Sequence, residues 1–462
     1  MGGAMKPMLL QDICERIGAA YTGDPEAAVT AISTDTRALP RGCLFVALSG
    51  DKFDGNDYVG EALKQGAAWA VAERLPEGCP RERVLPVKDT RAALLEIAGL
   101  YRSSLDVKVV AITGSVGKTT TKEMVACVME AAFPTLKTQQ NLNNEIGLSQ
   151  TILQLTEEHR VAVLELGMDG PGQIAPLSRC AAPDIAIVTN IGVSHLQKMG
   201  SREAILEEKL SIAEGLREGG VLLLNGDDSL LSARRGITCR VKRYGTAGLD
   251  AEVRAERIKE YSTYTTFEIL YNDKRFEARI PCMGRHNVGN ALAAFLAGTL
   301  LGVPPEPAIA ALEGYQPAGM RQRVVTHGEL TVVEDCYNAS PDSMRAAMNT
   351  LGALDCRGKR IAVLSDMLEL GALEEQAHLD VGTLIAGLGI DRLLCAGPLS
   401  RRYAEGAQAG GMGNARYFPD QEELWQYLKE ILAPGDVVWF KASRGMHLED
   451  LIQKVYKEYP IL

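Results

Sequence analysis

The sequence predicts an α/β protein built of three domains. Its 462 residues are too many for one hydrophobic core, because domains average about 150 residues. Short, continuous apolar runs alternate with helical segments along the chain, a pattern typical of parallel strands covered on both faces. A glycine-rich loop lies between one of these runs and a helix, as in doubly wound sheets.

The first predicted domain, residues 1–105, is α/β. Its clearest strands are separated by turn-rich segments and cover residues 28–32, 43–48 and 69–72. The second, residues 106–319, contains a parallel sheet. Its strands are expected at residues 107–112, 161–166, 185–189 and 220–224.

Two helices are predicted in the second domain, at residues 120–131 and 287–301. Between residues 252 and 280 the apolar pattern changes to alternation, clearest at residues 263–269. Alternation is typical of half-buried strands, so this segment is predicted as a hairpin insertion or an antiparallel edge.

The third predicted domain, residues 320–462, begins after a boundary near Gly319. Each of its apolar runs is followed by a polar or glycine turn and a helical segment. The runs cover residues 330–334, 360–364, 392–396 and 436–440. This order predicts a second, smaller Rossmann-like domain.

The composition excludes several classes of protein. A net charge of −10 and a pI near 5.3 argue against a nucleic-acid-binding surface, which needs clustered basic residues. No run of 18 apolar residues predicts a membrane span, and the first residues lack the apolar core of a signal peptide. The ten cysteines are scattered singly, which favours free thiols in a reducing compartment. We therefore expect a cytoplasmic protein.

The segment Thr113–Thr120 (Thr-Gly-Ser-Val-Gly-Lys-Thr-Thr) is typical of a phosphate-binding loop. Backbone N–H groups of such a loop and the following helix N-terminus hold anionic oxygens. Lys118 would neutralise the β- and γ-phosphates of ATP, and the Thr119 hydroxyl suits Mg²⁺ or phosphate. The general motif has a further glycine where this chain has Ile112. An ordinary βα turn with a solvated lysine is the alternative, but the order of strand, loop and helix favours ATP binding.

Polar residues also follow other apolar runs. Glu165 ends the strand at 161–164, and His195 follows the strand that ends at Asn190. Ligands of open α/β sheets collect at the carboxyl ends of strands, where a carboxylate and an imidazole can hold a divalent cation. Each residue alone is more often a structural hydrogen-bonding group. Together, behind a phosphate loop, they predict a metal site.

The third domain repeats this arrangement. Asp335, Asp366 and Lys441 each follow a predicted strand and should face a crevice. Arg321 lies at the domain junction, from which an arginine could reach the γ-phosphate when the domains close. A solvated linker charge is the alternative for Arg321.

Together these motifs resemble the Mur ligases, the amide-forming enzymes that build the peptidoglycan stem peptide. The resemblance covers essentially the whole chain and is carried by Thr113–Thr120, Glu165, His195 and Gly284–Ala291. In that family the short phosphate loop without the distant glycine is normal. The resemblance implies an N-terminal UDP-sugar domain, a central ATPase domain and a C-terminal domain that binds nucleotide and the incoming amine.

Five further stretches look most like the branch of the family that adds D-alanyl-D-alanine (D-Ala-D-Ala) to UDP-N-acetylmuramoyl-tripeptide. They are residues 141–147, 165–168, 337–343, 366–371 and 441–445. Relatives that add meso-diaminopimelate or lysine usually differ around Asn143 and Tyr337. Two positions depart from the family pattern: Ser365 replaces a glycine, and Asn56 stands where histidine is common, which leaves the uridine contacts open.

The resemblance also implies roles for individual residues. ATP would be bound by Gly114, Ser115, Val116, Gly117, Lys118, Thr119, Thr120, His286, Asn287, Asn290, Arg321 and Asp335. Two Mg²⁺ ions would be held by Thr119, Glu165, His195 and a Lys209 carbamylated by CO₂. Catalysis would depend on Lys118, Lys209, His195 and Glu165. Without the resemblance, Lys209 would be one charge on a solvated helix face, and His286, Asn287 and Asn290 would be helix-capping residues.

Substrate contacts follow from the same resemblance. Ser33, Thr36 and Arg37 match the UDP-sugar signature and supply donors suited to a diphosphate. The remaining candidates are Asn141, Asn143, Asn144, Asn338, Ser343, Lys441, Ser443 and Arg444, the last five for the dipeptide. Capping and turn formation are the alternatives for Asn338 and Ser343.

The expected reaction is ATP-dependent amide formation through an acyl phosphate, in a monomer that binds neither membrane nor nucleic acid. One alternative is a related ligase that adds a single amino acid, or a folylpolyglutamate-type ligase. A different class would be a P-loop switch or a nucleic-acid-stimulated ATPase. The acidic balance and the lack of a basic, aromatic-interleaved stretch weigh against that class.

Overall fold

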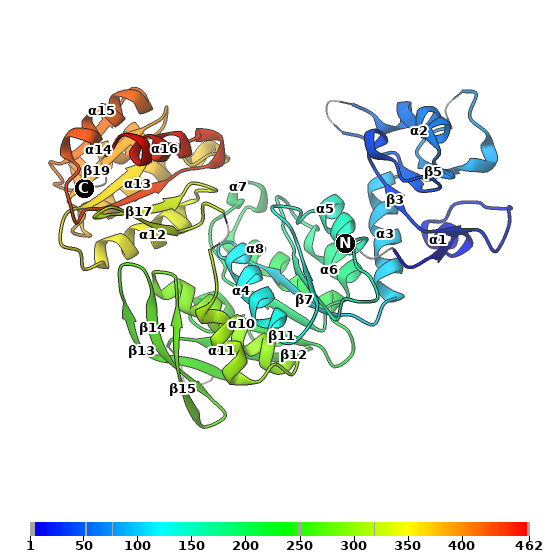
Figure 1. The fold of residues 1–462 in the computed structure, drawn as a ribbon, viewed down its shortest axis with the longest axis horizontal. Coiled ribbons are helices and arrows are strands. Elements are labelled where there is room, and N and C mark those ends of the chain that lie inside the picture. Colours follow the sequence, from blue (N-terminus) through cyan, green and yellow to red (C-terminus); the bar gives the residue numbers. More distant parts are fainter. Residues whose placement is uncertain (1–4, 51–52, 76, 248–250, 318, 460–462) are drawn as a thin grey trace.

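The computed structural model describes residues 5–50, 53–75, 77–247, 251–317 and 319–459. Figure 1 shows three lobes that follow one another along the chain, from the blue N-terminal lobe through the cyan and green central lobe to the yellow and red C-terminal lobe. Within the described ranges, no helix combines the length and apolar character needed to cross a membrane.

A four-stranded parallel sheet forms the N-terminal lobe, in the order β3-β4-β5-β6. A separate antiparallel pair, β1 with β2, lies beside it. The elements are β1 (Met8–Leu9), α1 (Leu10–Ile17), β2 (Ala28–Val29), β3 (Ile32–Ser33), η1 (Thr36–Ala38), β4 (Leu44–Val46), η2 (Gly55–Tyr58), α2 (Val59–Gln65), β5 (Trp69–Ala72), η3 (Arg81–Arg83), β6 (Val84–Pro86) and α3 (Thr90–Ser103).

The single strand predicted at residues 28–32 is therefore wrong. β2 pairs with β1, whereas β3 pairs with β4 in the other sheet. An apolar run shows that a segment is buried but not which neighbour it bonds to, so the sequence could not reveal this division.

The central lobe is built on a nine-stranded sheet in the order β15-β14-β13-β12-β11-β10-β7-β9-β8. Neighbours from β8 to β13 are parallel, and β13, β14 and β15 are antiparallel, so the predicted antiparallel edge is confirmed. The strands are β7 (Lys108–Thr113), β8 (Thr135–Lys137), β9 (Val161–Glu165), β10 (Ile185–Val188), β11 (Val221–Asn225), β12 (Arg240–Gly245), β13 (Val253–Glu260), β14 (Thr265–Tyr271) and β15 (Lys274–Ile280).

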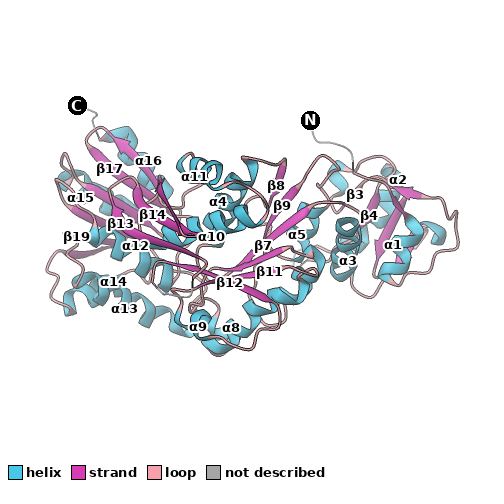
Figure 2. Cartoon of the chain, turned by 90° about the horizontal axis from the view of Figure 1, so that it is seen from below, coloured by secondary structure: helices cyan, strands magenta, loops and turns pink. Residues whose placement is uncertain are grey.

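Helices cover both faces of this sheet (Figures 1 and 2). Val110 and Ile112 of β7 face α4, α10 and α11, whereas Val109 and Ala111 face the core shared with α3, α5, α6 and α8. Successive residues of one strand thus serve two cores, which explains the continuous apolar run. The helices are α4 (Lys118–Glu130), α5 (Glu145–Ile152), α6 (Ile174–Ala181), α7 (Leu196–Met199), α8 (Arg202–Leu210), η4 (Ser211–Gly215), α9 (Ser229–Ala233), α10 (Arg285–Leu300) and α11 (Pro305–Glu313).

The C-terminal lobe has a six-stranded sheet in the order β16-β17-β21-β18-β19-β20, with only β16 antiparallel among its described strands. The doubly wound pattern predicted for this lobe is confirmed. Its elements are β16 (Arg323–His327), β17 (Leu330–Asp335), α12 (Pro341–Ala353), β18 (Arg360–Leu364), η5 (Gly371–Leu373), α13 (Glu374–Ala386), β19 (Arg392–Ala396), α14 (Arg401–Ala409), β20 (Ala415–Phe418), α15 (Gln421–Ile431), β21 (Val437–Lys441), η6 (Arg444–Met446) and α16 (Glu449–Glu458).

Helix α3 joins the N-terminal lobe to the central lobe, packing on α5 and α6. Its last turn carries Arg102, whose side chain is only 2% exposed. The guanidinium donates to the carbonyls of Val107 at 2.8 Å, Ala181 at 3.1 Å and Leu105 at 3.3 Å. One buried cation therefore satisfies carbonyls from α6 and from the connection between α3 and β7, which fixes the helix on the central lobe.

We predict that Arg102→Ala lowers the free energy of unfolding by about 2–4 kcal/mol, because it leaves these buried carbonyls without donors. The melting temperature of the first unfolding transition, followed by calorimetry, measures this loss. Exposed Arg81 is the matched control, and Arg81→Ala should melt like the unmodified chain. Equal melting of both variants would contradict the assignment.

Candidate active site

A cavity of about 960 Å³ lies where the lobes meet. It is lined by the phosphate loop, the start of α10, the segments that follow β17 and β21, and Arg91 of α3. Most of the predicted site residues are brought together here: Ser115, Val116, Gly117, Lys118, Thr119, Thr120, Asn141, Asn143, Asn144, Glu165, His195, His286, Asn287, Asn290, Arg321, Asp335, Asn338, Ser343, Lys441, Ser443 and Arg444.

The phosphate loop is held from the end of β10. Val116 N–H donates to Asn190 Oδ1 at 2.9 Å, and Val116 O accepts from Asn190 Nδ2 at 2.8 Å and from Thr189 Oγ1 at 2.7 Å. Gly114 has φ +152°, and a Cβ there would lie 1.8 Å from Thr189 Oγ1. The close approach of these two strand ends therefore requires glycine at position 114.

Lys118 points back over this loop. Its Nζ donates to Gly114 O at 2.8 Å and to Ser115 O at 3.4 Å. Burial lowers the pKa of Lys118, against the opposing effect of Glu165. Among the described residues this ammonium has only carbonyl partners and no ion pair, so it is suited to a polyphosphate that would supply the counter-charge.

Thr119 and Glu165 form an oxygen-rich corner beside the loop. Thr119 Oγ1 donates to Glu165 Oε2, and Asn143 Nδ2 donates to Glu165 Oε1, both at 2.9 Å. Glu165 is only 3% exposed. A hydroxyl and a carboxylate are hard oxygen ligands, which fit Mg²⁺ with water completing its coordination. No cluster of three or more His, Cys, Asp or Glu side chains in the described part of the chain could hold a metal by itself.

His195 and Lys209 lie next to this corner. His195 adopts a left-handed conformation with φ +62° before α7. Burial lowers the pKa of His195, and Lys118 and Lys209 lower it further, so the imidazole is neutral near pH 7 and can ligate a metal. Lys209, on α8, is 2% exposed, and burial with the nearby charge of Lys118 takes its pKa well below the ordinary value. The solvated-face alternative for Lys209 is therefore wrong.

The start of α10 joins the loop helix to the C-terminal lobe. Asn287 Nδ2 donates to Gln322 Oε1 at 2.7 Å and to Met283 O at 2.8 Å. Asn290 Oδ1 accepts from Thr121 Oγ1 of α4 at 3.0 Å. These amides are tied to other segments rather than to the helix's own first N–H groups, so capping does not explain them.

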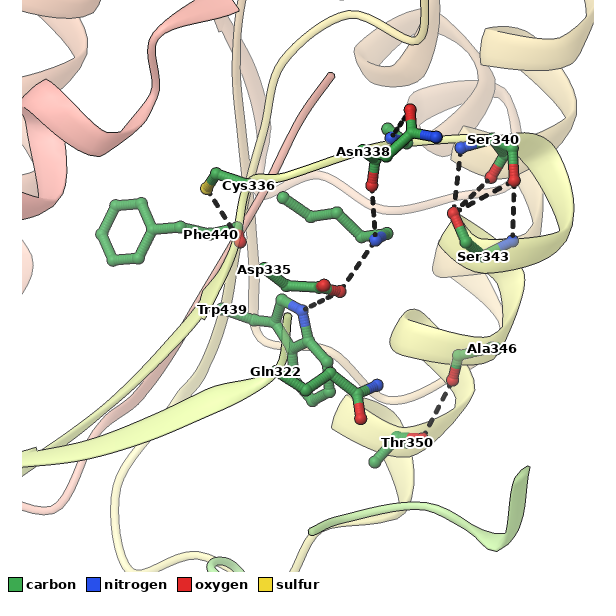
Figure 3. A network of polar contacts seen from close by, with 12 residues as sticks. Gln322, Asp335, Cys336, Asn338, Ser340, Ser343, Ala346, Thr350, Trp439 and Phe440 are labelled. Atoms are coloured by element: carbon green, nitrogen blue, oxygen red, sulfur yellow. Dashed lines mark hydrogen bonds and ion pairs between the residues drawn. The ribbon is translucent and has the colours of Figure 1, made fainter. Parts of the chain in front are cut away.

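Asp335 and Lys441 form a buried ion pair at the ends of adjacent strands β17 and β21. Lys441 Nζ lies 2.8 Å from Asp335 Oδ2 and also donates to Asn338 O at 3.2 Å. Figure 3 shows Trp439 beneath Asp335, to which its indole N–H donates at 3.4 Å. The pair fixes the crevice wall that the sequence predicted at these strand ends.

The other C-terminal candidates line the cavity but already have partners. Ser343 forms a capping box with Ser340 at the start of α12, as Figure 3 shows, which confirms the capping alternative. Asn338 Oδ1 accepts from Ala339 N–H at 2.8 Å. Ser443 Oγ accepts from Leu368 N–H at 2.9 Å, and exposed Arg444 pairs with Glu449 at 3.4 Å.

Arg321 lies against Tyr337, with its guanidinium carbon 4.0 Å from the ring centroid. Both residues line the cavity. The aromatic face orients the guanidinium at the junction between the lobes, so the solvated-linker alternative is wrong.

Ser33, Thr36 and Arg37 do not line the described cavity. Arg37 forms a bidentate pair with Asp35 and remains 88% exposed. Asn56, in contrast, is 1% exposed and bonds to Ser49, Asp54 and Glu73. The Asn56 amide therefore stabilises the N-terminal lobe through internal hydrogen bonds and is not turned toward a ligand.

Ser365 and Asp366 stabilise the C-terminal lobe. Ser365 Oγ donates to Ala396 O at 2.5 Å, and Asp366 Oδ1 accepts from Ser400 Oγ at 2.5 Å. The serine that replaces a glycine is thus accommodated by a hydrogen bond across β18 and β19. The crevice-facing role expected of Asp366 is wrong, because its carboxylate caps the turn before α14.

Sequence reasoning did not identify two contacts between segments far apart in the chain. Asp342 Oδ2 accepts from Val193 N–H at 2.7 Å and so connects the C-terminal lobe to the loop before His195. Arg91 Nη1, in the cavity wall, donates to Glu145 Oε1 at 3.2 Å. Asp342 and Glu145 lie within stretches that resemble the family, but the sequence does not show which distant group each one contacts. Glu369, in the cavity wall, also lies within such a stretch, and the sequence predicted no role for it.

Three family models match successive parts of the chain. They are described as Mur ligase family, catalytic domain (residues 28–102), Mur ligase middle domain (residues 112–298) and Mur ligase, glutamate ligase domain (residues 320–444). A curated relative from Bacillus subtilis (strain 168), UDP-N-acetylmuramoyl-tripeptide–D-alanyl-D-alanine ligase, is 41% identical over 431 residues and covers 93% of each chain.

Two solved structures have the same fold. MurF from Acinetobacter baumannii superposes with a TM-score of 0.87 at 31% identity, over 98% of this chain and 100% of that one. MurF ligase from Thermotoga maritima, solved with ADP, gives 0.83 at 28% identity, over 93% and 97%.

We predict that Asn190→Ala weakens binding of Mg²⁺–ADP about tenfold, because Val116 loses both hydrogen bonds to the Asn190 side chain and keeps only the one from Thr189, so the phosphate loop loosens. Isothermal titration calorimetry measures the dissociation constant. Asn414→Ala, at an exposed position of the C-terminal lobe, is the matched control and should bind like the unmodified chain. Unchanged affinity in Asn190→Ala would show that the loop keeps its shape without this clamp.

Proposed function

Because the chain belongs to the Mur ligase family, we propose that it joins D-Ala-D-Ala to UDP-N-acetylmuramoyl-tripeptide with ATP, as an enzyme of peptidoglycan precursor synthesis. One observation carries the proposal. The phosphate loop, the Thr119–Glu165 corner and the ends of β17 and β21 open into a single cavity, so a nucleotide and two substrates can meet there.

ATP is held between two lobes in this proposal. Lys118 and the N–H groups of the loop bind its phosphates, and His286, Asn287, Asn290 and Asp335 surround the adenosine. Arg321 faces the transferred phosphate from the junction, where it would stabilise developing charge. Thr119, Glu165 and His195 would hold Mg²⁺, which supplies charge neutralisation at the phosphates.

Lys209 is proposed to carry a carbamate formed with CO₂. Only a neutral amine reacts with CO₂, and the lowered pKa of Lys209 increases the share of that form. The charge of Lys118 contributes to the lowered pKa of Lys209. A carbamate would balance the charge of Lys118 and add an oxygen ligand to the metal corner.

The reaction is proposed to have two steps. The tripeptide carboxylate attacks the γ-phosphorus of ATP, the bond to the bridging oxygen breaks, and ADP leaves. The dipeptide amine then attacks the acyl phosphate carbon, loses a proton, and the tetrahedral intermediate expels inorganic phosphate. The residues contribute mainly by positioning the groups and neutralising charge.

The three lobes divide the substrates in this proposal. Residues 1–105 would bind the UDP-sugar through Ser33, Thr36 and Arg37, and residues 106–319 would bind ATP. Residues 320–462 would bind nucleotide and dipeptide, with Asn338, Ser343, Lys441, Ser443 and Arg444 on the dipeptide side. Asn141, Asn143 and Asn144, which line the cavity, would contact the peptide stem.

The ATP requirement and the ten free cysteines support a cytoplasmic location, and we propose that the chain works as a monomer. The nearest alternative is a ligase that adds one amino acid. The stretch around Asn143 and Tyr337, both in the cavity wall, favours the dipeptide.

We predict that ADP release depends on both UDP-N-acetylmuramoyl-tripeptide and D-Ala-D-Ala. Without the dipeptide the acyl phosphate accumulates, so turnover should fall to background. A coupled assay of ADP measures this, with D-alanine, L-lysine and meso-diaminopimelate tested as replacement amines. Equal turnover with a single amino acid would favour the alternative ligase.

We also predict a carbamate signal from Lys209 when the protein is incubated with ¹³C-bicarbonate and studied by NMR. The signal should weaken as the pH falls through the lowered pKa of Lys209, because protonation removes the neutral amine that CO₂ requires. Lys209→Arg should lose the signal and most of the ligase activity. Lys457→Arg, at an exposed position of α16, is the control and should keep both. A signal retained in Lys209→Arg would assign the carbamate elsewhere.

A further inference from the structure

The proposed dipeptide is a zwitterion, with an ammonium at one end and a carboxylate at the other. The candidates predicted for it, Asn338, Ser343, Lys441, Ser443 and Arg444, include two cations and three neutral groups but no carboxylate. A bound ammonium needs an acceptor, and a carboxylate is the strongest one available from side chains. The dipeptide side of the cavity therefore needs a carboxylate from another segment.

Five carboxylates line the cavity, and four of them are already engaged. Glu145 pairs with Arg91, Glu165 accepts from Thr119 and Asn143, Asp169 pairs with Lys198, and Asp335 pairs with Lys441. Glu369 is the only one with no hydrogen bond or ion pair to the described residues. Glu369 is exposed at the cavity wall, so its carboxylate is free to accept from a ligand.

The backbone holds Glu369 in an unusual conformation. Its φ is +64°, in the left-handed region that non-glycine residues rarely adopt. The residues before it are fixed from other elements: Met367 N–H donates to His378 Nε2 at 3.0 Å, and Leu368 N–H donates to Ser443 Oγ at 2.9 Å. A costly conformation that neighbouring contacts impose is typical of a residue whose side chain must be presented at a site.

The positions of the charged groups around Glu369 are suited to the two ends of a zwitterion. A Cβ on Gly445 would lie only 3.1 Å from Leu368 Cδ1, so the segments that carry Glu369 and Arg444 adjoin. The charge of Glu369 also reaches His195, where it opposes the lowering of the imidazole pKa by burial and nearby lysines. Glu369 is therefore near the segment of Arg444 and within electrostatic reach of His195 at the phosphate corner, where the amine would react.

We propose that Glu369 binds the ammonium group of the incoming dipeptide and so selects the amine substrate. This inference rests on the proposed function. Arg444 and Lys441 lie toward the carboxylate end, and Glu369 holds the amine end beside the acyl phosphate. A charged acceptor at this position favours amines that arrive protonated over neutral nucleophiles.

The test compares Glu369→Gln with the unmodified protein. The KM for D-Ala-D-Ala should rise about tenfold to a hundredfold, because an ion pair is lost, while the KM values for ATP and UDP-tripeptide change less than about twofold. Glu369→Asp should restore part of the affinity. Glu423→Gln, an exposed position on α15, is the matched control and should leave all three KM values unchanged.

Hydroxylamine distinguishes loss of the ammonium site from a general structural defect, because a structural defect would also reduce the reaction with hydroxylamine. It is neutral near pH 7 and needs no ammonium site, so Glu369→Gln should still form the tripeptide hydroxamate from the acyl phosphate at the rate of the unmodified protein. An unchanged KM for the dipeptide would overturn the proposal, and so would equal loss of hydroxamate and amide formation. If the unmodified protein makes neither product, the proposed function itself fails, which is a separate result.

Discussion

The site depends on the parallel register of three neighbouring strands, β9, β7 and β10. Ile112 of β7 lies opposite Glu165 of β9, and Thr113 lies opposite Val188 of β10. The phosphate loop, the metal carboxylate and the 189–195 loop therefore leave the sheet side by side. This close packing requires glycine at position 114, because no side chain fits between it and Thr189. Shifting either neighbour by one residue would turn Glu165 or Thr189 toward the opposite face.

The distribution of charge around the cavity indicates where negatively charged ligands would bind. Burial lowers the pKa values of Lys118 and Lys209, and neither lysine has an ion-pair partner among the described residues. Asp335 and Lys441, in contrast, neutralise each other across β17 and β21. The unpaired lysines are therefore in the central lobe, and for this reason we propose that the polyphosphate and the carbamate lie there.

The sequence predicted most strands of the two larger sheets and the loop–Glu165–His195 group, because both depend on local pattern and on the rule that strand ends share an edge. It could not divide residues 28–32 between two sheets, since strand pairing is not local. The hydrogen bonds of Asn190 to the phosphate loop and of Arg102 to Ala181 O were missed for the same reason. Each joins segments more than seventy residues apart, and backbone acceptors leave no pattern in the sequence. Ser343 was correctly given a capping alternative because its motif is local.

The C-terminal lobe contacts the central lobe at the elements that carry the chemistry. Asp342 accepts from Val193, two residues before His195, while Gly192 N–H donates to Ser115 Oγ of the phosphate loop at 2.8 Å. Arg321 leans on Tyr337 at the same junction. A movement of the C-terminal lobe would therefore be transmitted by hydrogen bonds to the phosphate loop. In the proposed reaction the amine must reach the acyl phosphate before water does, so binding of the amine to the C-terminal lobe would affect the geometry of the phosphate loop.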